Sequence, residues 1–458
     1  MMPALALPRP VQTTGQRSAR LCGLALVVLM LLVFVGLSPL TAQKAVNSTG
    51  DGNLLRQGLY ILVFGFVLLA SQALQYPQRL LAPTLSIWLV LAWSCLSLSW
   101  SLEPSIATRR LLLTSIIIWT VFATVERAGF ERSMRAFQIT LIGVLALNYA
   151  LVIASPATAI HQIADVVDPG LVGDWRGVLP QKNFAGALCA LTVISLAFYG
   201  GWINVALRWG LILAAAYFLF RSGSKTSLSV LGVAVVVGGA YLGYNPRYRS
   251  LLIPLVIGLL SLLVLIGQFY WGDLVRSLTT GEALTGRAEI WSVVLRYAED
   301  HWLRGAGFGS FWNIGSASPI FTYTHGWVSG LGNGHNGYLD LLITIGAPGL
   351  ILAVIAMILD PLVRLFASRT VMIQRGSVMI AMLVFCAGHN FSESSLFDRD
   401  MIMQLVFVFT VAMTVLATRK PLPPGRTEPF YWAWTAPGPA GSQSPAPDTR
   451  HRPGMNAQ

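Results

Sequence analysis

The stretch GNGHNGYLDLLITIGAPGL, residues 332–350, places a glycine-rich polar segment directly before an apolar run. Apolar runs of about 20 residues, the length of helix that spans a hydrocarbon core, recur along the whole chain. The 458-residue sequence is 55% hydrophobic and only 11% charged, whereas a soluble domain carries about 25% charged residues. The sequence therefore predicts an all-α polytopic membrane protein and excludes a soluble one.

The spacing of the apolar runs predicts about 12 transmembrane helices. They fall near residues 21–40, 54–74, 81–100, 110–125, 137–155, 183–202, 205–221, 226–244, 251–271, 336–358, 376–392 and 400–418. The fourth and seventh runs are short, so we expect a tilted or broken helix at each. The first run exceeds the apolar core of a signal peptide, about 7–15 residues, and a poor cleavage site follows it, so we expect a retained helix.

Lys and Arg in short loops predict which side of the membrane each loop faces, because such loops stay in the cytoplasm. The formal charge of +12 is biased toward alternate loops and the two tails. We therefore expect both termini in the cytoplasm. The predicted parts are a tail over 1–20, helices over 21–271, an outer loop over 272–335, helices over 336–418, and a Pro- and Gly-rich, disordered tail over 419–458.

The outer loop, residues 272–335, is far longer than an ordinary connection. Its segment GRAEIWSVVLRYAEDHW, residues 286–302, has the apolar spacing of an amphipathic helix. The face expected to be apolar consists of Ile290, Trp291, Val294, Leu295 and Ala298. We expect this helix along the outer membrane–water interface, with Trp291 and Trp302 at the level of the lipid headgroups.

Several cationic side chains remain on the predicted outer side, against the charge rule. They are Arg176, Lys182, Arg221, Lys225 and Arg287, with His335 at the start of a span. Ionisable groups near a membrane are expensive and tend to mark a functional cavity. Guanidinium and ammonium groups together suit an anion with several oxygens, above all phosphate or diphosphate.

Each of these residues also has a structural interpretation. Arg176 can be a solvated loop charge, Lys225 can extend to the lipid headgroups, and His335 can be a histidine satisfied at a helix start. The functional interpretation is favoured because the charges come from separate segments and meet on one face. Asn183 follows Lys182, Asn336 follows His335, and Glu393 lies at the outer end of a span.

Two other sequence patterns resemble nucleotide-binding motifs but lack features that those motifs require. The segment SGSKTS, residues 222–227, lacks the glycines of a nucleotide phosphate loop, and GAGFGSF, residues 305–311, lacks the strand–Gly–helix context of a dinucleotide site. The four cysteines are far apart inside apolar runs, and no metal-ligand spacing is present. Without a basic module, the positive charge does not predict a nucleic-acid partner, and we expect no metal.

Five motifs in order carry a resemblance to a known family. They are RGVLPQKNFAG at 176–186, SGSKTSLS at 222–229, GRAEIW at 286–291 with RGAGFGSFW at 304–312, the His335–Asn336 pair before an apolar run, and FSESSLFDRD at 391–400. In this order they resemble the O-antigen ligase and polysaccharide polymerase superfamily of bacterial inner-membrane proteins, closest to the exopolysaccharide-production polymerases. One departure is Gln181, where that branch is expected to carry His.

The resemblance implies a GT-C-like membrane glycosyltransferase with its active site at the periplasmic face. Such proteins act on glycans carried by undecaprenyl diphosphate and use no cofactor, nucleotide sugar or metal. The family's arginines correspond to Arg221 and Arg287, and its histidine corresponds to His335. The implied partners are the lipid-linked donor, the glycan acceptor and the bilayer, with flippase and chain-length regulator proteins as further candidates.

The chemistry of the residues agrees with that expectation. Cleavage of a sugar–diphosphate bond builds negative charge on the leaving group, which fixed cations stabilise, and a base must take the proton of the attacking hydroxyl. We predict His335 as that base, with Asn336 orienting it and Arg221 and Arg287 binding the diphosphate. The remaining predicted substrate-binding residues are Lys225, Arg176, Lys182, Asn183 and Glu393.

Three functions stay open at this point. A polymerase joins one repeat unit to another, whereas a ligase moves a finished glycan to lipid A-core or to a protein. Both use the same donor and the same chemistry. The third function is transport of an anionic glycolipid or another polyanion, for which ionisable residues at mid-membrane or paired broken helices are typical.

Overall fold

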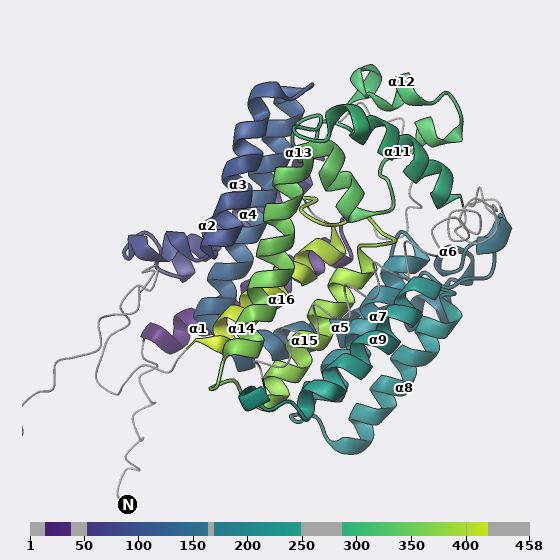
Figure 1. Ribbon diagram of the computed structural model, residues 1–458. Helices are drawn as coiled ribbons and strands as arrows, with labels where there is room; N and C mark the ends of the chain where they lie inside the picture. The colour runs from purple at the N-terminus through teal and green to yellow at the C-terminus, as the bar shows by residue number, and fades with distance from the viewer. Residues whose placement is uncertain (1–13, 38–52, 164–168, 249–285, 400, 420–458) are drawn as a thin grey trace, which may run out of the picture. The chain divides into compact units, whose positions relative to one another are not determined.

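The computed structural model describes residues 14–37, 53–163, 169–248, 286–399 and 401–419. Within these ranges the regular structure is helical, apart from one isolated antiparallel β-bridge between Ile160 and Trp175. The helices are α1 (Thr14–Phe34), α2 (Leu54–Ala70), α3 (Leu85–Ser97), α4 (Pro104–Ala128), α5 (Phe130–Ala154), α6 (Pro156–Ala159), α7 (Lys182–Tyr199), α8 (Val205–Arg221), α9 (Lys225–Leu242), α11 (Arg287–His301), α12 (Ile320–Tyr323), α13 (Gly337–Val354), α14 (Asp360–Ala367), α15 (Ile373–His389) and α16 (Ile402–Thr418) (Figure 1).

The all-α, multi-pass prediction is confirmed. In the described ranges 6 helices are long and apolar enough to cross a membrane, and four shorter apolar helices accompany them. Every predicted span coincides with a helix except the ninth, at 251–271, which lies outside the described residues together with residues 1–13, 272–285 and 420–458. The seventh span, 205–221, has the bounds of α8.

One predicted loop is wrong. Residues 126–136 were expected to connect two spans, but α4 continues to Ala128 and α5 begins at Phe130. Gly129 alone makes the turn, with φ at 80°, a backbone conformation that glycine adopts without steric cost. The charged residues of this stretch lie on helix ends, where Glu131 pairs with Arg375 at 2.9 Å and Glu126 pairs with Arg419 at 2.8 Å. The fourth span is therefore a 25-residue helix rather than a short one.

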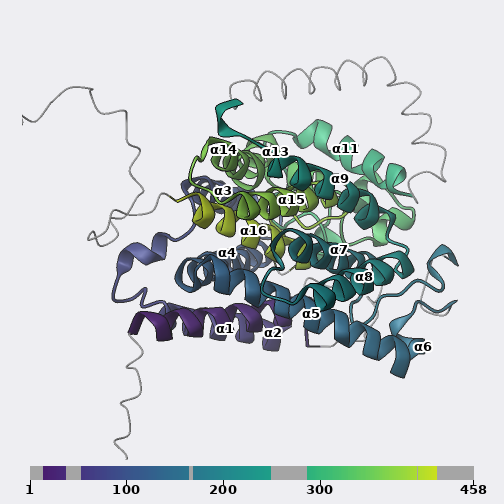
Figure 2. The same cartoon turned by 90° about the horizontal axis from the view of Figure 1, so that it is seen from below.

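Helix α16 lies inside the bundle, packed against α4 and α15 (Figure 2). Its sequence IMQLVFVFTVAMTVLAT has no charged residue, and almost all its side chains are buried. The one amide, on Gln404, accepts a hydrogen bond from the backbone N–H of Phe397 through Oε1 at 2.9 Å. A polar group in an apolar interior needs such a partner, so α16 fixes the position of the loop that leads into it.

Helix α13 is broken inside its apolar run. Gly346 has φ 68° and ψ 179°, and the connection after α11 lies against this break (Figure 1). The backbone N–H of Ala347 donates to the carbonyl of Trp302 at 2.7 Å, and the carbonyl of Ile345 accepts from Trp93 Nε1 at 2.8 Å. Non-helical backbone at membrane depth is tolerated only where protein satisfies its polar groups, and these two bonds do so.

The outer loop has a core of its own, in which one face of α11 packs on residues 306–331 and on α13. The amphipathic helix is confirmed, but its buried face differs from the predicted one. Val293 and Tyr297 are buried beside Ile290, whereas Leu295 is 44% exposed. The apolar face packs on the protein, and Trp291 donates its indole N–H to the carbonyl of Gly334 at 3.0 Å. The position of the helix at the headgroups stays a prediction.

Arg110 of α4 ties this loop to the bundle. Its buried guanidinium donates hydrogen bonds to the carbonyl oxygens of Gly309, Trp312 and Asn313, the last two at 2.8 and 2.9 Å. The side chain of Asn313 in turn donates to the carbonyl of Gly332 at 3.2 Å. Arg110 of α4 therefore holds Asn313, and Asn313 in turn holds the segment before α13.

Candidate functional site

The loop after α15 folds around the side chain of Asn390. Its amide nitrogen donates to the carbonyl of Cys386 at 2.9 Å, and its oxygen accepts from the backbone N–H and the hydroxyl of Ser395 at 3.2 and 2.9 Å. Asparagine readily stabilises such turns because its side chain can bond to nearby backbone groups. The turn directs Glu393 toward α7, α11 and the start of α13.

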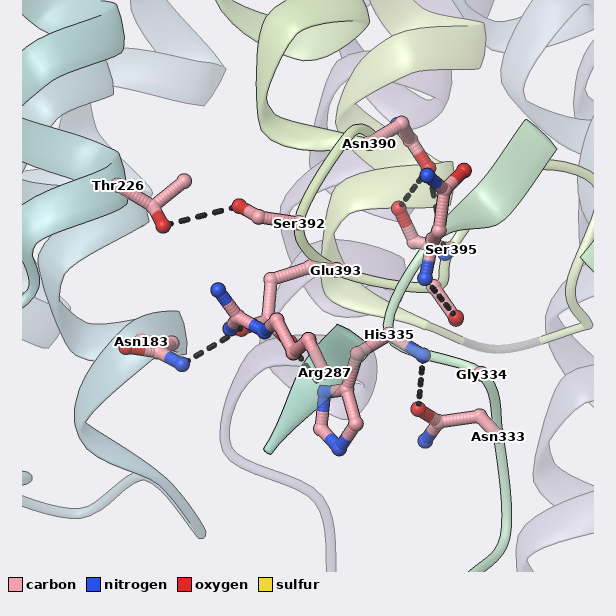
Figure 3. Close-up of polar contacts among 12 residues, drawn as sticks. Asn183, Thr226, Arg287, Asn333, Gly334, His335, Asn390, Ser392, Glu393 and Ser395 are labelled. Carbon is pink, nitrogen blue, oxygen red and sulfur yellow. Dashed lines mark hydrogen bonds and ion pairs between the residues drawn. The ribbon is translucent and has the colours of Figure 1, made fainter. Parts of the chain in front are cut away.

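Glu393 joins three of the residues predicted from sequence. Its Oε1 accepts from Asn183 Nδ2 at 2.5 Å and from Arg287 Nη2 at 3.0 Å, and its Oε2 lies 3.6 Å from Nδ1 of His335. These residues come from the first turns of α7 and α11 and from the segment before α13 (Figure 3). We call Asn183, Arg287, His335 and Glu393 the Glu393 cluster.

The backbone around His335 is held on both sides. The N–H of Gly334 donates to both carboxylate oxygens of Asp340 at 3.1 Å, and the N–H of His335 donates to the side chain of Asn333 at 3.1 Å. The N–H of Asn336 donates to the hydroxyl of Ser394 at 3.0 Å. A Cβ on Gly334 would lie 2.5 Å from Asp340 Oδ1, so the glycine is required for this close approach.

His335 has φ at 49°, in the left-handed region. Such a conformation costs a non-glycine residue roughly 1–3 kcal/mol, and it clusters at functional sites. Here it directs the ring at Glu393, with 26% of the side chain exposed. Figure 3 shows that one ring nitrogen faces Arg287 and Glu393, whereas the other points away from them.

The Glu393 carboxylate is almost fully buried, with 5% of the side chain exposed. Burial by itself raises its pKa, but the contact with His335 and the charge of Arg287 outweigh burial and hold the pKa of Glu393 below its ordinary value. Glu393 is therefore an anion at neutral pH, and it places a fixed negative charge between the histidine and the arginine.

Asn336 caps α13. Its side-chain oxygen accepts from the backbone N–H groups of Tyr338 and Leu339 at 3.1 and 3.2 Å, the bonds of an N-terminal cap. Among the described residues, the charged partner of the His335 ring is Glu393. The geometry thus gives Asn336 a role in starting the helix, and its predicted roles in orienting His335 and binding substrate stay predictions.

The other predicted cations lie around Trp175. Lys182 forms an ion pair with Asp174 at 2.6 Å. The guanidinium of Arg221 lies over the Trp175 ring at 5.0 Å, and its backbone carbonyl accepts from the N–H of Trp175 at 3.0 Å. We call these four residues the Trp175 group.

Arg176 and Lys225 lie in the same two segments as the Trp175 group. The Arg176 side chain is buried, so a solvated loop charge is the wrong interpretation of this residue. Lys225 is exposed at the first position of α9.

The Glu393 cluster and the Trp175 group are connected through two helix starts. On α7, Lys182 belongs to the group and Asn183 to the cluster. At the start of α9, Thr226 follows Lys225 and its hydroxyl bonds to that of Ser392 at 2.9 Å. A helix N-terminus carries a partial positive charge. The starts of α7, α9, α11 and α13 therefore supply a positive environment in addition to the side chains.

Sequence reasoning missed several supporting residues, namely Asp340, Ser394, Thr226, Asn390 and Arg110. Asp340 carried a signal, because it is an acidic residue in an otherwise apolar run. The others act through neighbours far away in sequence. Among the described residues no three His, Cys, Asp or Glu side chains gather as a metal site would need, and the metal-free reaction stays a prediction.

Chemically, the arrangement combines a histidine with an adjacent carboxylate, and arginines suited to an oxyanion. Residues 209–354 match the family model described as O-Antigen ligase. The matched residues include Arg221, Lys225, Arg287, His335 and Asn336, whereas Glu393 lies beyond them. No curated protein matches the chain.

Proposed function

We propose that the chain is a glycosyltransferase of the O-antigen ligase and polymerase superfamily, which the match over residues 209–354 supports. The proposed reaction joins oligosaccharide repeat units carried on undecaprenyl diphosphate into exopolysaccharide, at the periplasmic face of the bacterial inner membrane. The observation that carries the proposal is the convergence of Arg287, Asn183 and His335 on one carboxylate, Glu393.

In the proposed mechanism, a sugar hydroxyl of the acceptor attacks the anomeric carbon of the donor. His335 takes the hydroxyl proton, the new C–O bond forms, and the sugar–diphosphate bond breaks with its electron pair on the diphosphate. A positioned general base contributes about 10²–10⁴ in rate. Attack opposite the leaving group inverts the configuration of the anomeric carbon.

Arg287 and Arg221 would stabilise the charge that builds on the diphosphate. One fixed donor of this kind is worth about 10²–10³ in rate. The ion pair with Glu393 engages Nη2 of Arg287, and a guanidinium carries five N–H donors, so the arginine retains donors for a phosphate. The undecaprenyl chain would lie in the bilayer beside the helices, and residues 286–336 would cover the sugars.

A ligase that moves a finished glycan to lipid A-core is the second candidate, because it uses the same donor and the same residues. The RGVLPQKNFAG and SGSKTSLS motifs, which resemble the exopolysaccharide branch, favour the polymerase. A transporter is disfavoured, since the charged residues of the Glu393 cluster and the Trp175 group lie at helix ends and in loops rather than at the middle of the helices. Flippase and chain-length regulator proteins remain proposed partners.

The test is an assay with purified full-length protein and undecaprenyl-diphosphate-linked repeat units, without metal or nucleotide. We expect a ladder of longer lipid-linked glycans, abolished by His335→Ala and by Arg287→Ala. Arg132→Ala, a change at an exposed arginine of α5, is the matched control. Transfer that requires lipid A-core identifies a ligase, and an intact donor under every condition refutes the glycosyltransferase.

A further inference from the structure

We propose that Glu393 is a positioning residue that fixes the tautomer and orientation of His335 and thereby assigns proton acceptance to Nε2. The inference deepens the proposed function and rests on it. It also changes the role expected for Glu393 from sequence, which was contact with substrate.

The geometry of the carboxylate carries the proposal. Oε2 lies 3.6 Å from Nδ1 of His335, while Oε1 is held by Asn183 and Arg287 at 2.5 and 3.0 Å. The 3.6 Å separation is longer than a hydrogen bond, and Nδ1 is a buried atom with no hydrogen-bond partner among the described residues. A neutral imidazole has one N–H, and a lone pair on Nδ1 would face the carboxylate anion. The proton is therefore favoured on Nδ1, and the lone pair is left on Nε2, the nitrogen that points away from Glu393 in Figure 3.

The same carboxylate fits poorly as a substrate ligand. It is an anion with 5% of its side chain exposed, and a diphosphate beside it would be repelled. One other role remains, in which Glu393 occupies Arg287 as an internal anion until the donor diphosphate displaces it. The two roles predict different effects on kcat when the Glu393 charge is removed.

The titratable groups that face His335 come from each neighbouring element. Arg287 lies at the start of α11, Asp340 in the first turn of α13, and Glu393 in the loop after α15, with His389 behind it at the end of α15. Of these groups in the described part of the chain, Glu393 is the one within ion-pair distance of the imidazole. Loss of the Glu393 charge removes the counter-charge of a protonated ring and leaves the Arg287 charge uncompensated.

The decisive variant is Glu393→Gln, which keeps the size of the side chain and removes its charge. We expect kcat to fall about 10–100-fold, the range known for loss of a carboxylate that orients a metal-bound histidine. The donor KM should not rise. In a plot of kcat against pH, the acid limb should move to lower pH, since the protonated ring of His335 is no longer stabilised by the Glu393 charge. Unchanged kcat with an unchanged acid limb would overturn the proposal and favour displacement by the donor.

Two further variants separate positioning from general damage. Glu131→Gln makes the same chemical change in a carboxylate paired with Arg375 at 2.9 Å. That pair lies at the start of α15, whereas Glu393 follows the end of the same helix, so the two carboxylates are about 25 Å apart. Glu131→Gln should therefore leave the acid limb of the kcat profile unchanged. Glu393→Asp keeps the charge, so it should keep the acid limb even where the shorter side chain lowers kcat. If Glu393→Asp shifts the limb as Glu393→Gln does, the charge is not the cause.

A readout without glycan transfer keeps the two proposals distinguishable. Diethyl pyrocarbonate reacts with neutral imidazole, and mass spectrometry of His335 across a pH series reports when the ring loses its proton. Glu393→Gln should move this midpoint to lower pH in the donor-free protein. An inactive wild type with this shift refutes the proposed function alone, and an unmoved midpoint refutes the positioning role.

Discussion

At the scale of single residues, the site depends on a histidine in an unfavourable backbone conformation. His335 has φ at 49°, and the bonds of Asp340, Ser394 and Asn333 to the adjacent backbone N–H groups hold it there. Strain of this kind persists only where the surroundings over-determine the conformation. The structure thus gives up stability to direct one ring at Glu393.

Replacement of His335 by glycine tests that strain. Both His335→Gly and His335→Ala remove the ring and its contact with Glu393, so their difference reports the backbone. We expect His335→Gly to be more stable than His335→Ala by about 1 kcal/mol, because glycine adopts a positive φ at no steric cost. Both variants should lose at least about 100-fold in glycan transfer. Thermal unfolding of the purified variants measures the difference, and a less stable glycine variant would mean that the backbone is unstrained.

At the scale of elements, the break in α13 links the outer loop to the membrane part. A Cβ on Gly346 would lie 2.1 Å from the carbonyl oxygen of Leu303, so the two segments touch through backbone alone. The first turns of α13 carry Asp340 and follow His335 directly. The position of the loop and that of the histidine are therefore coupled.

Gly346→Ala should separate those segments. The new methyl group meets backbone that cannot move aside, and φ at 68° is unfavourable for alanine. We expect a loss of more than about 2 kcal/mol in stability and lower transfer activity. Gly232→Ala in α9 is the matched control, because no atom lies within 4 Å of the added carbon. That variant should unfold at the same temperature as wild type or slightly higher.

Arg110 couples the same loop to α4, and Arg110→Met removes its donors while it keeps much of the packing. Three carbonyl oxygens lose their partner, two of them now 2.8 and 2.9 Å from the guanidinium. We expect destabilisation of about 3 kcal/mol and faster proteolysis within residues 302–333. Arg132→Met, at an exposed arginine, should change neither. Proteolysis at the wild-type rate would show that the loop holds without α4.

These elements also mark what sequence could and could not predict. The length of apolar runs located the spans well, because burial in a bilayer selects apolar residues over a whole helix. The turn at Gly129 was missed, since the charged residues of 126–136 interrupt the apolar run although they lie on helix ends, where Glu131 and Glu126 form ion pairs. Arg287 and His335 were predicted from the charges left on the predicted outer side and from the family resemblance. Arg110 and the break at Gly346 were not, because their partners lie far away along the chain.

At the scale of the whole molecule, the predicted topology decides which side of the membrane the Glu393 cluster faces. Contacts such as Lys182–Asp174 and Arg287–Glu393 connect segments predicted on the outer side, and Arg375–Glu131 connects segments predicted inside. The alternation of the helices agrees with these contacts. Which end faces the cytoplasm follows only from the bias of Lys and Arg, and the proposed substrate requires the Glu393 cluster to face the periplasm.

Single cysteines can decide this orientation. In a variant free of the four native cysteines, His325→Cys would sit in the exposed outer loop and Arg369→Cys in the exposed connection between α14 and α15. We expect a membrane-impermeant maleimide to label His325→Cys in intact cells, and Arg369→Cys only after the inner membrane is permeabilised. The reverse pattern would place the Glu393 cluster in the cytoplasm. A base and two arginines there would meet the lipid-linked glycan before its transfer across the membrane, so a periplasmic polymerase would be excluded.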